Sequence, residues 1–152
     1  MLTLLISILV PLIVYIVTPR LLKTGRKQQG WLIAACSLFF ISYFLPSPLV
    51  HGTETQFMTH LVGGGFFSGF LWLYIVRAKR IVFQNALVEV ASLFALVCTL
   101  GVMNELFEIV IFWLGRMPMG IADTSWDLVA NTIGALSFYL AYVIARNFEC
   151  DE

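Results

Sequence analysis

The chain is dominated by long apolar stretches separated by short polar or charged connections. A helix needs about 20 predominantly apolar residues to cross the hydrocarbon core of a bilayer, with about 17–25 as the usual range. Five segments approach this length, and we expect each of them to cross a membrane as a helix. Their approximate bounds are 2–17, 31–45, 57–76, 82–103 and 125–145.

The composition supports a single all-α transmembrane domain covering residues 1–152. Of the 152 residues, 60% are hydrophobic and 12% are charged, whereas soluble domains are about 45–50% apolar and about 25% charged. The expected partner is therefore the lipid bilayer, and the net charge of zero argues against nucleic acid. The first segment lacks a basic start and a small-residue cleavage pattern, so we expect a retained helix rather than a signal peptide.

The fourth apolar segment is longer than one membrane crossing requires. It is interrupted by Asn104, Glu105 and Glu108, and apolar residues then resume to residue 114. Residues 104–114 therefore extend the fourth helix or form a separate interfacial segment, with Gly101 as a plausible bend point. The sequence leaves both alternatives open.

The basic residues predict the orientation of the bundle. Short loops rich in Lys and Arg stay in the cytoplasm. In a five-span arrangement, Arg116 is the one basic residue on the opposite side. We therefore expect the N-terminus outside and the C-terminus inside, in a plasma or inner membrane. The basic residues on the expected cytoplasmic side are Arg20, Lys23, Arg26, Lys27, Arg77, Lys79, Arg80 and Arg146.

Polar residues from three distant segments are expected at one depth near the outer surface. Ionisable groups inside a membrane normally face the bundle interior or water and pair with each other. We therefore predict an outward-facing site in which four side chains act as catalytic groups or as ligands of a divalent metal ion. These are His60, Glu105, Glu108 and Asp127. Asn104, Asp123 and Asn131 are the candidate substrate-binding residues.

Two interpretations of the acidic residues stay open. Close carboxylates repel, so one gains a proton or a cation binds between them. The same groups therefore fit a divalent metal site or a general acid/base pair. Simpler explanations are preferred for two other acids: Asp123 as a helix N-cap, and Glu89 as a residue that snorkels to the inner interface.

Small residues make the third segment unusually thin. Gly65 and Gly69 have the GxxxG spacing, and Gly64 with Ser68 forms a second such pair. Residues of this kind let helices approach closely in lipid. The third helix is therefore predicted to lie at the centre of the bundle.

The last two segments resemble a known family of membrane proteins. The sequence Asn104-Glu105-Leu106-Phe107-Glu108, followed by the pattern D-x-x-x-D-x-x-x-N-x-x-G from Asp123 to Gly134, is similar to small bacterial VanZ-like proteins and to the YjdF-like group. The resemblance covers about a quarter of the chain. It implies an integral membrane protein in which Glu105, Glu108, Asp123, Asp127 and Asn131 are the matching positions. The VanZ-like name comes from a glycopeptide-resistance determinant, and the resemblance defines no reaction.

Three functions are compatible with these patterns. The favoured one is a membrane-embedded hydrolase or transferase that acts on a lipid-linked or cell-envelope substrate. The second is a cation- or proton-coupled transporter or channel component. The third is a non-catalytic subunit of a membrane complex, or a homo-oligomer.

Overall fold

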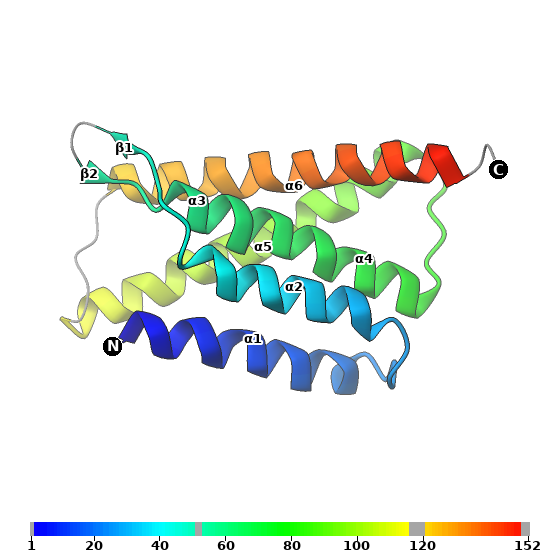
Figure 1. Cartoon of the computed structure of the whole chain (residues 1–152), viewed down its shortest axis with the longest axis horizontal. Coiled ribbons are helices and arrows are strands. Elements are labelled where there is room, and N and C mark those ends of the chain that lie inside the picture. Colours follow the sequence, from blue (N-terminus) through cyan, green and yellow to red (C-terminus); the bar gives the residue numbers. More distant parts are fainter. Residues whose placement is uncertain (1, 51–52, 116–120, 150–152) are drawn as a thin grey trace.

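The chain folds into a bundle of helices that run back and forth between two ends (Figure 1). The computed structural model describes residues 2–50, 53–115 and 121–149, with side chains described for 4–49, 55–115 and 124–148. The antiparallel strands β1 (Leu49–Val50) and β2 (Thr53–Glu54) form a short ribbon after the second helix. The helical elements are α1 (Leu2–Leu21), α2 (Gln29–Ser42), α3 (Phe57–His60), the π-helical segment η1 (Leu61–Phe66), α4 (Phe67–Lys79), α5 (Ala86–Trp113) and α6 (Ile121–Glu149).

The predicted helical class is confirmed, but the bounds of all five predicted helices differ from the observed ones, most clearly in α1, α5 and α6. α1 continues through Pro11 and Pro19 to Leu21, beyond the predicted end at residue 17. α5 is one helix of 28 residues, so residues 104–113 extend it and do not form a separate segment. α6 begins at Ile121 and ends at Glu149, several residues beyond the predicted span at each end.

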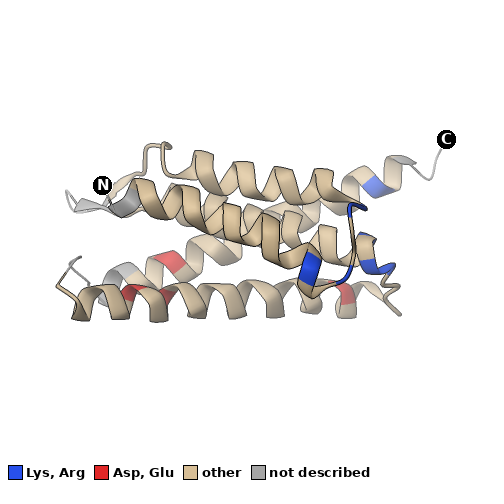
Figure 2. Cartoon of the chain, turned by 90° about the horizontal axis from the view of Figure 1, so that it is seen from below, with Lys and Arg blue, Asp and Glu red and all other residues tan. Residues whose placement is uncertain are grey.

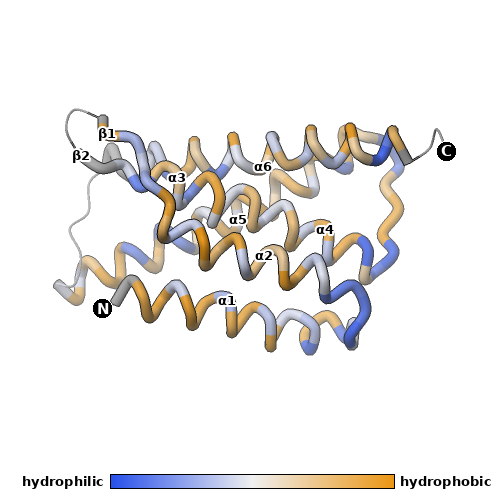
Figure 3. The backbone as a smooth tube through the Cα atoms, viewed as in Figure 1, coloured by the Kyte–Doolittle hydropathy of each residue, from blue (hydrophilic) through white to orange (hydrophobic). Residues whose placement is uncertain are grey.

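Within the part of the chain that the structure describes, four helical stretches are long and apolar enough to cross a membrane: Leu4–Leu21, Phe57–Lys79, Ala86–Trp113 and Thr124–Phe148. α2 is apolar but has only 14 residues. Hydrophobic residues cover much of each helix, and hydrophilic residues gather most clearly in the connection between α1 and α2 and at the end of α4 (Figure 3). Many large apolar side chains on α1, α5 and α6 are exposed on the outside of the bundle, as lipid-facing surfaces require.

The third pass, from α3 through η1 to α4, lies at the centre of the bundle as predicted. Of the span Phe57–Lys79, 56% is buried, compared with 11% for Leu4–Leu21. A Cβ atom on Gly65 would lie 2.6 Å from both the Asn131 carbonyl oxygen and the Gly134 Cα. The η1 and α6 backbones are therefore in direct contact, which only glycine permits at these positions.

The charges separate along the bundle axis (Figure 2). Lys and Arg residues gather at the end where α1, α4 and α6 finish, while most described acidic residues lie towards the other end. α1 begins at this acidic end and α6 finishes at the basic end (Figure 1). We call these the acidic end and the basic end below.

Candidate functional site

His60 lies at the junction between an α-helical and a π-helical segment. It is the last residue of α3, and the π-helical segment η1 begins at the next residue. Neighbouring Thr59 donates a hydrogen bond to the Ser42 carbonyl oxygen (3.4 Å), which ties this turn to α2. Single π-helical turns occur frequently at functional sites. The side chain of His60 is buried in the bundle.

Asp127 faces His60 from α6. Its side chain is among the most completely buried in the chain, with 2% of the residue exposed. The distance from His60 Nε2 to Asp127 Oδ1 is 3.3 Å. The backbone contact between η1 and α6 at Gly65 and Gly134 brings the two side chains together, because it removes the usual space between helices.

Glu108 of α5 is the third member of a group that also contains His60 and Asp127. Asn104 lies one turn earlier and donates a hydrogen bond from Nδ2 to Glu108 Oε1 (2.6 Å), which orients the carboxylate. One ligand atom each from His60, Glu108 and Asp127 lies within 4.8 Å of the others. Two ligands on opposite sides of one ion are about 4.2 Å apart, from metal–ligand distances near 2.1 Å, so small side-chain shifts would suffice to enclose an ion.

Glu105 is buried on α5 but does not belong to this group of three among the described residues. The depth of Glu105 in the bundle follows from the preceding turn of α5, where a Cβ on Gly101 would lie 3.4 Å from Asn131 Nδ2. Glu105 follows Gly101 by one turn, and Asp127 precedes Asn131 by one turn. Because α5 and α6 run in opposite directions (Figure 1), Glu105 and Asp127 lie at about the same depth.

Asn131 is buried between glycines from two other helices. Its side chain lies against Gly64 of η1 and Gly101 of α5, where any Cβ on Gly64 would overlap Asn131 Oδ1. Only 4% of Asn131 is exposed. It follows Asp127 by one turn of α6, so it lies closer to the middle of the bundle than the group of three. The side chain of Asp123, the remaining predicted site residue, lies outside the described residues.

The electrostatics of the site call for a proton or a cation among the carboxylates. Glu105, Glu108 and Asp127 carry carboxylates at the acidic end, where the described part of the chain places no Lys or Arg (Figure 2). Tyr43, just past the end of α2, lies within electrostatic reach of Glu108. Negative groups gathered at low dielectric repel unless a proton or a cation neutralises them. One imidazole and two carboxylates form a mixed nitrogen and oxygen donor set of the kind that binds divalent ions.

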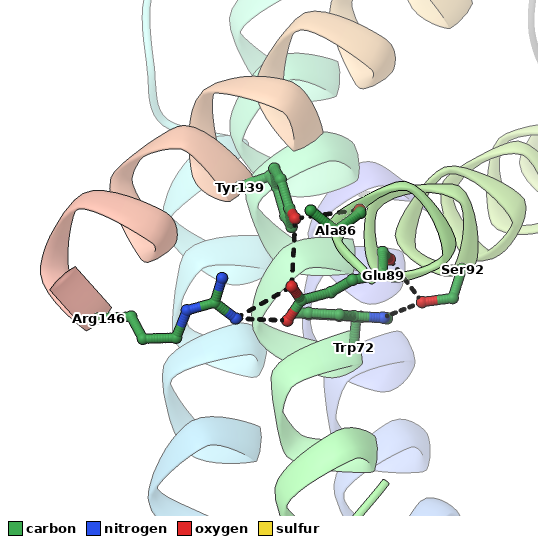
Figure 4. A network of polar contacts seen from close by, with 6 residues as sticks. All are labelled: Trp72, Ala86, Glu89, Ser92, Tyr139 and Arg146. Atoms are coloured by element: carbon green, nitrogen blue, oxygen red, sulfur yellow. Dashed lines mark hydrogen bonds and ion pairs between the residues drawn. The ribbon is translucent and has the colours of Figure 1, made fainter. Parts of the chain in front are cut away.

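A second polar cluster lies at the basic end, and its arrangement was not predicted from the sequence (Figure 4). Glu89 does not snorkel to the interface as predicted. It is buried, and both of its carboxylate oxygens lie 3.0 Å from Arg146 Nη1. It also accepts a hydrogen bond from the Tyr139 hydroxyl (3.2 Å). In the same cluster, Trp72 Nε1 donates to Ser92 Oγ (2.9 Å). Tyr139 and Arg146 of α6 therefore provide hydrogen-bond partners for the Glu89 carboxylate, so this carboxylate does not need to reach water.

No protein-family model, curated protein or solved structure matches the chain significantly.

Proposed function

We propose that the protein is a membrane-embedded enzyme that binds a divalent metal ion through His60, Glu108 and Asp127 and acts on a lipid-linked or cell-envelope substrate. The observation that carries this proposal is the convergence of these three side chains, from three separate passes, within 4.8 Å. Glu105 supplies further negative charge at the same depth, Asn104 orients Glu108, and Asn131 supports the inner side of the site.

In the proposed arrangement, all five passes cross the membrane and the basic end faces the cytoplasm. The alternation of the passes between two ends (Figure 1) and the gathering of Lys and Arg at one end (Figure 2) support this orientation. The chain is then a plasma- or inner-membrane protein with its N-terminus outside. The candidate metal site faces the extracytoplasmic surface, where lipid-linked envelope precursors are accessible.

A divalent ion held in such a site polarises a phosphoryl or carbonyl oxygen and lowers the pKa of a bound water. The residues of the chain would hold the ion, exclude bulk water from its inner side and keep the carboxylates in place. The resemblance of residues 104–108 and 123–134 to VanZ-like proteins is a second, weaker support for an envelope-related role.

The core between the two ends argues against a continuous ion path. Below the site, α4, α5 and α6 meet in an apolar cluster that includes Trp72, Leu93, Val97 and Phe138. Glu89, the described acid at the basic end, is neutralised by Arg146. A transporter would need polar groups between these levels, so the structure favours a site that is served from one side.

The test is the metal content of the purified protein. We expect a stoichiometric divalent ion in the wild type and at least a tenfold loss in Asp127→Asn and Glu108→Gln, because each variant removes a charged ligand. Glu89→Gln is the matched control, since it removes a buried carboxylate at the opposite end, and it should retain the ion.

Equal metal content in all four proteins, or none in any of them, would contradict the metal site. Activity is read separately in cells. If Asp127→Asn loses the ion while the cellular phenotype and protein abundance stay unchanged, the metal is structural and the enzymatic role is wrong.

A further inference from the structure

A cavity of about 790 Å³ opens at the basic end, away from the candidate metal site. It lies between the end of α4, the start of α5 and the end of α6. Its polar lining includes Gln28, Arg77, Arg80, Asn85, Glu89 and Arg146. Three guanidinium groups thus face one carboxylate, which gives the lining a net positive charge.

Arg146 keeps donors for a further anion although it pairs with Glu89. Both contacts with the Glu89 carboxylate are made by one nitrogen, Nη1, whereas a guanidinium carries five N–H donors. The other terminal nitrogen points away from Glu89 (Figure 4). The side chain of Arg146 is 38% exposed, so it is accessible from the cavity.

The connection from α4 to α5 places Arg80 beside one further positive element, the N-terminus of α5. Arg80 ends α4 in the left-handed region (φ 54°), and the next amide, of Ile81, returns to the Val76 carbonyl oxygen (2.9 Å). α5 then begins, with Asn85 as its N-cap accepting from the Val88 amide (2.9 Å). The positive N-terminal end of this long helix dipole therefore lies beside the arginines.

The rim of the cavity is apolar. Ile81, Val82 and Phe83 line it, and Val82 is 91% exposed. An anionic group on the arginines would therefore have hydrocarbon surface next to it. A phospholipid combines these two features in one molecule, and basic pockets between transmembrane helices on the cytoplasmic side are known to bind lipid phosphate groups.

We propose that this cavity binds the phosphate headgroup of an anionic phospholipid, with Arg77, Arg80 and Arg146 as its ligands and Val82 and Phe83 against its acyl chains. The site is separate from the candidate metal centre and does not depend on it. It would anchor the ends of α4, α5 and α6 to the inner leaflet.

The test is lipid binding to the delipidated, full-length protein in detergent, followed by native mass spectrometry. Phosphatidylglycerol is the anionic probe and phosphatidylcholine the zwitterionic one. We expect preferential retention of phosphatidylglycerol. Arg77→Gln and Arg80→Gln should each weaken this retention about fivefold, from the usual contribution of one basic residue near an anionic membrane surface. Arg26→Gln is the matched control, because Arg26 is exposed in the connection after α1 but does not line the cavity.

Equal retention of the two lipids would overturn the proposal, and so would an equal loss in Arg26→Gln, which would indicate general surface attraction. Inorganic phosphate at millimolar concentration is the second probe. If it binds and phosphatidylglycerol does not, the cavity takes a soluble anion and the lipid assignment is wrong. Metal content serves as an independent readout, and Arg77→Gln and Arg80→Gln should leave it unchanged.

Discussion

Both carboxylate oxygens of Glu89 lie 3.0 Å from Nη1 of Arg146, a residue 57 positions further along the chain. The two residues are unequally buried, with 7% of the Glu89 side chain exposed and 38% of the Arg146 side chain exposed. The pair joins the start of α5 to the end of α6. α5 and α6 also carry the acids of the candidate site, which lie at the opposite end of the bundle from this pair.

Removing each partner of this pair should have unequal effects. Arg146→Gln leaves Glu89 charged and buried with the Tyr139 hydroxyl as its described partner, and should lower the free energy of unfolding by about 3 kcal/mol. Glu89→Gln should cost about 1 kcal/mol or less, because the half-exposed arginine can extend to water. Unfolding in mixed micelles measures both. Equal losses, or a larger loss in Glu89→Gln, would contradict this assignment.

The contact between η1 and α6 should tolerate no side chain. Gly65→Ala and Gly134→Ala each place a methyl group against backbone atoms of the other helix, and we expect losses of at least about 2 kcal/mol, as for overpacking. The separation of the helices should also move His60 away from Asp127 and reduce metal binding. Gly30→Ala in α2 is the control, because its Cβ would meet nothing within 4 Å. This variant should be neutral or slightly stabilising, by up to about 1 kcal/mol. Wild-type stability in Gly65→Ala would show that the helices are further apart.

The connection after α1 is held to α4 by a buried hydrogen bond between the hydroxyls of Thr24 and Tyr74. Tyr74 is completely buried, so its hydroxyl depends on this partner among the described residues. Thr24→Val should therefore lower the free energy of unfolding by about 1–3 kcal/mol, the range for a buried polar group that loses its partner. Tyr74→Phe removes the polar group together with the bond and should cost less. The opposite order would contradict the assignment.

The five-span orientation predicts which residues react from outside the cell. With native cysteines replaced, a single cysteine at Lys23 should react with a membrane-impermeant maleimide only after the cells are opened. A single cysteine at Ser47, between α2 and β1, should react in intact cells. Equal reactivity of the two positions would place both on one side, and α2 would then not cross the membrane.

Much of the architecture could be predicted because lipid imposes it. The lengths and apolarity of the segments indicate helices, and the glycine run at residues 63–65 indicates a central helix. The predicted ends of the helices were less accurate than the predicted helical class. Pro19 is a conventional helix breaker, but like Pro11 it lies inside α1, so the predicted end at residue 17 was too early. Apolarity marks where lipid begins and ends, whereas the hydrogen-bonded helix continues beyond it, as in α6.

Three of the four residues predicted as metal ligands lie together in the structure, and Glu105 lies outside that group. His60, Glu108 and Asp127 converge because polar groups on separate helices pair with each other in an apolar medium. The sequence could not indicate that Glu105 lies outside this group, because positions 105 and 108 share one helix face and only tertiary packing separates them. It also gave no partner for Glu89, since an ion pair between distant helices leaves no local pattern.

The π-helical segment η1 sets the rotation of His60 relative to the rest of its own helix. An α-helix turns about 100° per residue, and a π-helical turn contains one residue more than an α-helical turn. Deleting one residue from Leu61–Phe66 would convert the segment into a regular α-helix. Because the wide turn already absorbs one extra residue, the shortened helix would present the imidazole at nearly the same angle to α6. Deleting Val62 should therefore leave metal binding and the helix content measured by circular dichroism nearly unchanged, whereas inserting one residue into α4 just after η1 should rotate the imidazole by about 100° away from α6 and abolish metal binding. The wide turn thus lets the chain carry one extra residue without turning the histidine away from its partners.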